Sequence, residues 1–349
     1  MHRRLLQLIV ILHFVMAIWA IEQIAIEPNA VHAQEEFSCA DVSEIPQGEC
    51  EALAAIKDAN GGSSTWFTTD TPPCSWTNLE CTDGHVTGLY LSNNQLTSVP
   101  PEIGNLSSLT QLDLYGNQLT SVPPEIGNLS SLIALNLMDN QLATLPVEIG
   151  NLSSLKALNL RDNQLATLPT EIGNLSSLTW LYLSNNQLTT LPVEIGNLSS
   201  LKALYLMDNQ LATLPVEIGN LSSLKALYLR DNQLATLPVE IGNLSSLGWL
   251  ELSDNQLMSV PPEIGNLSSL IELSLSNNQL TTLPTGIGNL TLLTILNLDN
   301  NELTSIPPEI SQLPSLRTLS VTGNPLVPTA IDVQDEPALD GLFLPFVVR

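Results

Sequence analysis

Leucine, isoleucine and valine return at fixed positions along most of the chain, with a period of 23 residues. An asparagine marks this period from Asn94 to Asn324 without one insertion or deletion. Neighbouring copies can be almost identical, since Leu201–Ser223 and Leu224–Ser246 differ only where Met207 is replaced by Arg230. Self-similarity at this period predicts a stack of small structural units rather than separate domains. The apolar positions of one copy are Leu109, Leu112, Leu114, Leu119, Val122, Ile126 and Leu129.

Each copy begins with an alternation that predicts a short β-strand. Leu112 and Leu114 alternate with Gln111 and Tyr115, so the leucines should point inward and the alternates outward. Prolines on the return side interrupt regular structure, and a short turn of helix is expected there. Because one copy cannot offset the entropy cost of ordering its chain, neighbours must stack. The prediction is an α/β solenoid, curved like a horseshoe, with a parallel sheet on its concave face and short helical or irregular turns on its convex face.

The pattern around each asparagine, L-x-x-L-x-L-x-x-N-x-L, resembles the leucine-rich repeat family, with eleven repeats in residues 86–325. The resemblance implies that each asparagine amide bonds to backbone groups of neighbouring turns. Residues 34–85 are similar to the N-terminal cap of plant extracellular and secreted bacterial members. No cysteine-bearing cap occupies the other end. We interpret residues 326–349, which end in LFLPFVVR, as a strand-like lid, with a sorting signal as the alternative.

The N-terminus has the pattern of a secretory signal. Arg3 and Arg4 precede an apolar run from Leu5 to Ile21. Cleavage after Ala33, which gives a signal peptide of residues 1–33, or after Ala20 fits the small-residue rule, and an uncleaved anchor is the alternative. No later run is long enough to span a membrane. We therefore expect a secreted or cell-surface protein.

The cysteine content is consistent with export. All four cysteines precede the repeats, and an even number can pair as disulfides outside the cell. Three pairings are possible, and the short local loops favour Cys39–Cys50 and Cys74–Cys81. A zinc site is the competing interpretation, but there is no C-x-x-C spacing and no histidine cluster. In this segment we expect a helix over 43–61, followed by a hairpin that turns at residues 82–84.

Composition narrows the function. The formal net charge is −25, which argues against nucleic acid as a partner because phosphate binding needs a basic patch. If the signal is removed at Ala33, His85 is the only histidine, and no histidine-assisted nucleophile can be assembled. We predict no enzyme activity, no metal site and no cofactor.

The residues that vary among copies lie at the outward strand positions, and aromatic residues concentrate there. Tyr182, Tyr205 and Tyr228 should form an exposed ridge on three successive strands, flanked by Trp180 and Trp249. The same positions also hold Tyr90 and Tyr115. Met138, Arg161, Met207 and Arg230 should share one strand column, with each pair 69 residues apart, as expected if Leu132–Ser200 was duplicated onto Leu201–Ser269.

Aromatic residues and arginine dominate the energetics of interfaces. The predicted ligand-binding site on the concave face therefore consists of Tyr182, Tyr205, Tyr228, Trp180, Trp249, Arg161, Arg230, Met138 and Met207. The alternative is that they cover the sheet as good strand formers. We predict a non-catalytic recognition module that binds an extracellular protein. The alternatives are a glycan-binding or glycanase-inhibiting protein and a structural or adhesion protein. The N-L-S/T sites from Asn105 to Asn289 match the glycosylation sequon, but they recur as part of the repeat.

Overall fold

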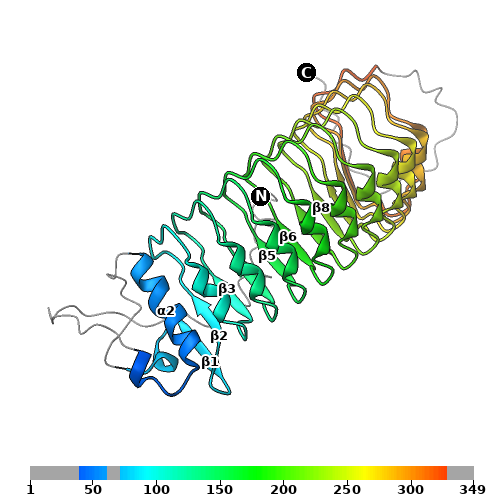
Figure 1. Ribbon diagram of the computed structural model, residues 1–349. Coiled ribbons are helices and arrows are strands. Elements are labelled where there is room, and N and C mark those ends of the chain that lie inside the picture. The colour runs from blue at the N-terminus through cyan, green and yellow to red at the C-terminus, as the bar shows by residue number, and fades with distance from the viewer. Residues whose placement is uncertain (1–38, 61–70, 328–349) are drawn as a thin grey trace. The chain divides into compact units, whose positions relative to one another are not determined.

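The computed structural model describes residues 39–60 and 71–327. The predicted signal peptide and nearly all of the predicted lid lie outside these residues. The cap and the repeats belong to one unit, Phe37–Arg349. In it the described strands form a single twelve-stranded sheet in chain order (Figure 1). The strands are β1 (Leu79–Thr82), β2 (His85–Tyr90), β3 (Gln111–Asp113), β4 (Ala134–Asn136), β5 (Ala157–Asn159), β6 (Trp180–Tyr182), β7 (Ala203–Tyr205), β8 (Ala226–Tyr228), β9 (Trp249–Glu251), β10 (Glu272–Ser274), β11 (Ile295–Asn297) and β12 (Thr318–Ser320).

The sheet begins with a hairpin and continues in parallel. β1 and β2 are antiparallel, and their turn places Asp83 and Gly84 at φ values of 53° and 78°. This confirms the predicted hairpin, whose turn needs left-handed residues. β2 also pairs with β3 in parallel, and each later strand adds in parallel with a shift of one repeat. β2 therefore joins the cap to the repeats.

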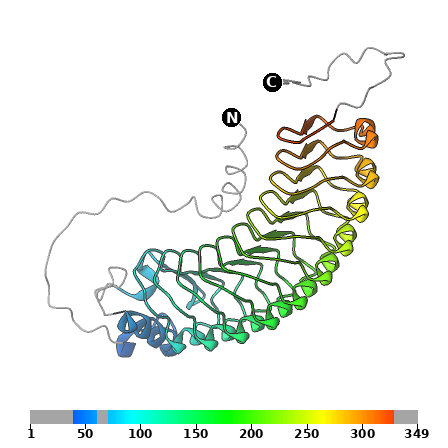
Figure 2. The ribbon, with the colours of Figure 1, turned by 90° about the horizontal axis from the view of Figure 1, so that it is seen from above.

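Short 3-10 turns return the chain from each strand to the next, as predicted, and they follow the outer side of the curve while the strands follow the inner side (Figure 2). Each begins after a proline, which is extended before η3 to η11, as in Pro146 at φ −68° and ψ 149°. A Cβ on Gly127 would lie 2.5 Å from the backbone oxygen of Glu148, so glycine lets neighbouring turns approach. The turns are η3 (Pro101–Asn105), η4 (Pro124–Asn128), η5 (Val147–Asn151), η6 (Thr170–Asn174), η7 (Val193–Asn197), η8 (Val216–Asn220), η9 (Val239–Asn243), η10 (Pro262–Asn266), η11 (Thr285–Asn289) and η12 (Pro308–Gln312).

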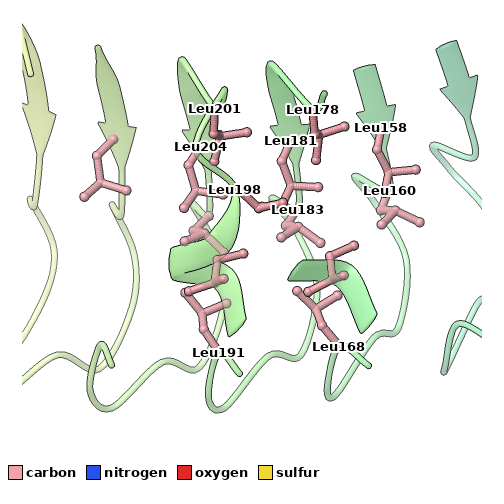
Figure 3. Close-up of a cluster of buried hydrophobic side chains, with 14 of the residues drawn as sticks. Leu158, Leu160, Leu168, Leu178, Leu181, Leu183, Leu191, Leu198, Leu201 and Leu204 are labelled. Carbon is pink, nitrogen blue, oxygen red and sulfur yellow. The ribbon is translucent and has the colours of Figure 1, made fainter. Parts of the chain in front are cut away.

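The interior is a continuous column of leucine and isoleucine. Equivalent leucines of successive turns, such as Leu158, Leu181 and Leu204, lie beside one another (Figure 3). The seven apolar positions predicted from the repeat at 109–131 are all buried, with at most 4% of their surface exposed. Each turn packs on the next, which is why the repeats need their neighbours.

The repeating asparagine has the role that the family resemblance implied. Asn140 Nδ2 donates to the carbonyl oxygens of Leu114 at 3.0 Å and Leu137 at 3.1 Å. Its Oδ1 accepts the backbone N–H of Leu119 at 3.0 Å. These are buried backbone groups at the bend after the strand, where they have no partner in the strand ladder. One side chain therefore ties its own turn to the preceding one.

The cap differs from expectation in its helix. α2 covers Gln47–Ala59, shorter than the predicted 43–61, because Pro46 is extended and forms the N-cap. Glu49, which the helical pattern did not single out, is buried, with Oε1 2.7 Å from His85 Nδ1 and Oε2 accepting the N–H of Val86 at 2.8 Å. Two short 3-10 turns, η1 (Cys39–Asp41) and η2 (Pro73–Ser75), complete the described cap. Its disulfides are Cys39–Cys50 and Cys74–Cys81, which confirms the favoured pairing.

Candidate binding face

The centre of the candidate site is a row of three tyrosines at the third position of β6, β7 and β8. The parallel register pairs Tyr182 with Tyr205 and Tyr205 with Tyr228. Their rings stack at centroid distances of 4.6 and 4.9 Å, with interplanar angles of 8° and 9°. We call these residues the tyrosine ladder. The repeat pitch causes the stacking, because the strand spacing is close to the preferred separation of stacked rings.

The tyrosine ladder is less exposed than the sequence suggested. All three side chains are half-buried, and both faces of the Tyr205 ring lie against its neighbours. Burial raises the pKa of each phenol above its usual value, and Tyr205 adds to the effect at Tyr182 and Tyr228. The expected exposed ridge is therefore wrong in detail. Tyr205 presents the edge of its ring, rather than a face, to a ligand.

Two tryptophans frame a pair of alanines in the row beside the ladder. The register places Ala203 and Ala226 between Trp180 on β6 and Trp249 on β9. The tryptophans are 41% and 39% exposed, whereas the alanines are 6% and 8% exposed. β6 and β9 are three strand steps apart, about 14 Å. We call these four residues the aromatic slot, and the ladder borders one of its sides.

The methionines and arginines of the predicted site do not lie on strands. β4 ends at Asn136 and β7 at Tyr205, two residues before Met138 and Met207. The strands stop because the chain bends to the asparagine turn, where Asp139 and Asp208 take φ values of 55° and 56°. Arg161 and Arg230 occupy the same position in other repeats. Both are exposed, whereas both methionines are half-buried.

The two arginines differ in their partners. Arg161 Nε lies 3.1 Å from Asp162 Oδ2. Arg230 Nε lies 3.0 Å from Asp231 Oδ2 and 2.9 Å from Asp254 Oδ2, so it bridges two repeats. Burial opposes the charge of Arg230, but the carboxylates outweigh it and raise its pKa. The second partner is missing for Arg161 because Asn185 stands where Asp254 would be.

The opposite side of the face carries lysines that the predicted site left out, although they stand beside the strands in the sequence. Lys156, Lys202 and Lys225 immediately precede β5, β7 and β8, and all three are exposed. In the part of the chain that the structure describes, none of them is ion-paired. Lys202 and Lys225 lie next in the chain to the alanines of the slot.

Comparison with family models identifies the repeat. The model described as "Leucine-rich repeat region" matches residues 126–210 and 193–279. The model described as "Leucine rich repeat" matches residues 84–142 and 268–326. The chain is a leucine-rich repeat protein. No curated protein compared with the chain matches it significantly.

Solved structures place this leucine-rich repeat protein among bacterial and plant relatives. It is similar to a leucine-rich repeat protein of Leptospira interrogans, with 37% identity, a TM-score of 0.52, and coverage of 69% of this chain and 79% of that one. It is similar to the plant peptide hormone receptor RGFR1 in complex with RGF2, with 31% identity, a TM-score of 0.58, and coverage of 72% and 49%. A plant ice-binding protein gives 25% identity, a TM-score of 0.64, and coverage of 83% and 100%. The chain thus spans about half of that plant receptor chain.

One buried group in this leucine-rich repeat face could not have been found from the sequence. The hydroxyl of Ser184, which follows β6 and is only 3% exposed, has no hydrogen-bond partner. Its equivalent Ser253 is hydrogen-bonded to Ser274 at 2.6 Å and Ser276 at 2.8 Å. The repeat after Ser184 carries Tyr205 and Met207 at those positions, and their side chains leave Ser184 unpaired.

The described residues of this leucine-rich repeat protein contain no cluster of His, Cys, Asp and Glu side chains able to hold a metal ion. None of their helices is long and apolar enough to cross a membrane. What the face offers a ligand is an apolar centre, phenol hydroxyls and charged rims. These groups suit non-covalent binding.

Proposed function

We propose that this leucine-rich repeat protein is secreted or held at the cell surface and acts as a non-catalytic module that binds a polypeptide on its concave face. The signal-like segment and the two disulfides support export. Similarity to a plant peptide hormone receptor supports a polypeptide ligand.

The clustering of aromatic residues carries this proposal. All five aromatic residues of β3 to β12 lie on four successive strands, β6 to β9. Elsewhere these outward strand positions hold residues such as Ala134, Asn136 and Ala157. Tyr90 on β2 stands in the same column as the ladder but is separated from Tyr182 by three strands. A framework role therefore does not explain why the aromatics of β6 to β9 lie side by side. A partly exposed aromatic cluster with a polar rim has the composition of an interface centre.

The array itself supplies substitutions that separate binding from folding. Trp180→Ala and Trp249→Ala introduce the residue that Ala203 and Ala226 already hold at that position. Tyr205→Asn introduces the residue of Asn159. Ile295→Ala, in the same row as the tryptophans but on β11, is the matched control.

The experiment measures the affinity of a partner captured from surface extract of the source organism and then purified. We expect the Trp180→Ala/Trp249→Ala variant to bind at least about tenfold more weakly, because truncating an interface anchor costs about 2 kcal/mol or more. The Ile295→Ala control should bind as the original chain does. Protease treatment of the extract should abolish capture, whereas glycan removal should not. Equal affinity of the slot variant and the control would refute the proposal.

A second candidate function is adsorption to ice, which a different surface favours. Successive repeats carry an exposed serine or threonine just before the leucine, valine or isoleucine that precedes the return-side proline. Within the described residues, from the second repeat onward, these hydroxyls form no hydrogen bond with the protein. The row, at a pitch of about 4.8 Å, consists of Ser121, Thr144, Thr167, Thr190, Thr213, Thr236, Ser259, Thr282 and Ser305. Similarity to a plant ice-binding protein supports this candidate.

Ice recrystallisation in the presence of the protein distinguishes the two functions. If the hydroxyl row acts, Thr167→Lys/Thr190→Lys/Thr213→Lys should abolish inhibition of crystal growth, because three charges interrupt an uncharged surface. The Trp180→Ala/Trp249→Ala variant should inhibit normally. An original chain without effect on crystal growth would eliminate this candidate.

A further inference from the structure

The candidate binding face has different electrical properties on its two sides. On one side of the tyrosine ladder, Arg161 and Arg230 are ion-paired with aspartates. On the other side, Lys156, Lys202 and Lys225 are exposed, and none forms an ion pair within the described residues. The chain as a whole carries a formal charge of −25. Three unpaired cations in one row beside the aromatic slot are therefore unusual for this protein.

We propose that the ligand of this face is an extended polypeptide segment that places acidic side chains, at alternate positions, along the lysine row and an apolar or aromatic side chain against the exposed indoles of Trp180 and Trp249. This inference rests on the proposed polypeptide-binding function and adds the chemistry and the orientation of the ligand. The segment crosses the strands of the sheet, with its carboxylates toward Lys202 and Lys225.

The spacing of the lysines fits such a segment. Lys156 precedes β5 and Lys225 precedes β8, three strand steps away, which is about 14 Å. Carboxylates at positions i, i+2 and i+4 of an extended chain lie on one side and span about 13–14 Å. Lys202 precedes β7, between the two. Flexible lysine side chains absorb the remaining difference of a few ångströms.

The ladder itself is poorly suited to stacking a sugar ring. A sugar ring packs flat against the face of an aromatic ring, but both faces of Tyr205 are covered by Tyr182 and Tyr228, so stacking would fall to the exposed Trp180 and Trp249. The outward edges of the ladder suit hydrogen bonds from phenol hydroxyls to backbone carbonyl oxygens. Aromatic residues in this arrangement are typical of interface centres between proteins.

The acidic character of the whole chain does not prevent this interaction. Screening limits the reach of exposed charges to about 8 Å at physiological salt. The aspartates nearest to the slot lie across the face from the lysines, and Arg230 neutralises part of Asp231 and Asp254. Glu251 follows Tyr228 in the ladder row and Glu272 follows Trp249 in the tryptophan row, so the face is acidic on its β9 and β10 side. The carboxylates of the segment therefore lie on the β5 to β8 side, where the lysines stand.

The test uses fluorescence anisotropy with three labelled probes and purified full chain. The first probe is the peptide Gly-Glu-Leu-Glu-Tyr-Glu-Gly, the second replaces its glutamates with lysines, and the third is an oligomer of galacturonic acid. We expect the acidic peptide to bind and the lysine peptide not to bind. Lys202→Glu/Lys225→Glu should weaken the acidic peptide about tenfold or more, because two attractive pairs become repulsive. The thermal transition should stay unchanged, since both side chains are exposed and unpaired.

Two further variants separate this inference from the function on which it rests. Arg317→Glu changes the same row next to β12, far from the slot, and should leave affinity unchanged. If Trp180→Ala/Trp249→Ala abolishes partner binding while Lys202→Glu/Lys225→Glu does not affect it, the polypeptide-binding function stands and the acidic preference is wrong. If neither variant matters, both fail. Failure of the original chain to bind the acidic peptide, or binding of the galacturonate alone, overturns the inference.

Discussion

Nε of Arg230 lies 2.9 Å from Oδ2 of Asp254, a residue of the following repeat. This contact is what distinguishes Arg230 from Met207, the single difference between two otherwise identical copies. The equivalent Arg161 is paired only with its chain neighbour Asp162. Arginine at the same repeat position therefore forms different ion pairs, because the following repeat determines whether a second aspartate is present.

Replacing each arginine by methionine, the residue already present in the same column, measures this difference. Arg230→Met should reduce the free energy of unfolding by about 0.5 kcal/mol, since the side chain is nearly half exposed and its ion pairs are screened. Arg161→Met should change it by less. Urea denaturation followed by circular dichroism gives both values. A larger loss for Arg161→Met would contradict the role of Asp254.

Ser184 and Ser253 offer an opposite pair of outcomes for one substitution. Ser184→Ala removes a buried hydroxyl without a partner and should leave the protein as stable or more stable by about 1 kcal/mol. Ser253→Ala breaks bonds to Ser274 and Ser276 and should cost about 1 kcal/mol. Denaturant midpoints of the two variants provide the comparison. If Ser184→Ala destabilises the chain, its hydroxyl has a partner after all.

Asn140→Ala should be far more damaging than the same change at the first repeat. It leaves the N–H of Leu119 buried without a partner and removes one of two hydrogen bonds from the carbonyl oxygens of Leu114 and Leu137, which keep Asn117 and Asn163 as donors. Together these losses should cost about 3 kcal/mol. Asn94 is half-buried and its amide donates only to Ser92, so Asn94→Ala should cost about 1 kcal/mol or less. Chemical denaturation of the two variants gives both losses in free energy of unfolding. Equal losses would contradict the role of the asparagine in joining neighbouring turns.

Alkaline pH should destabilise the fold through its buried phenols. The pKa values of Tyr182, Tyr205 and Tyr228 are raised by burial, and that of Tyr90 is raised to about 12. Above about pH 10 the unfolded chain loses phenol protons that the folded chain keeps, so rising pH favours unfolding. The denaturant midpoint should therefore fall between about pH 9 and pH 11.

Replacing the three ladder tyrosines by phenylalanine provides the control for the pH experiment. This variant keeps the ring stack but has no phenol proton to lose, so its midpoint should fall less over the same pH range. Phenolate absorbance of the folded original chain should rise later than that of free tyrosine. Identical pH dependence of the two proteins would contradict the burial effect.

The fold was predictable because each repeat states the same physical requirements. The seven apolar positions of the second repeat are apolar in the other repeats as well, and these side chains fill the interior. The asparagine at the position of Asn140 also repeats, where backbone groups lose their hydrogen-bond partners in the sheet. The hairpin turn was predictable because Asp83 and Gly84 tolerate left-handed backbone. The helix start was missed because Pro46 terminates the helix at its N-terminal side, a local signal that the apolar spacing conceals.

The site was predictable only as far as periodicity reaches. The period placed Tyr182, Tyr205 and Tyr228 in one row, but it does not state the tilt of the rings, so their mutual burial was missed. The strands are also shorter than predicted. The chain bends at Asp208, so β7 ends before Met207. Glu49 pairs with His85, 36 positions away, and no local pattern reports such a contact. Ser184 is unpaired because the next repeat lacks the serines that bond to Ser253, which no local pattern reports either.

The asparagine contacts also bear on how such a chain can change over generations. Because every junction between turns is made by the same groups, loss of residues 132–200 would join Ser131 to Leu201 and recreate a junction that already exists at Ser200. Recombination can therefore shuffle, add or drop whole units while the architecture survives. The recognition surface would then evolve by duplication of whole repeats, while the interior residues stay the same.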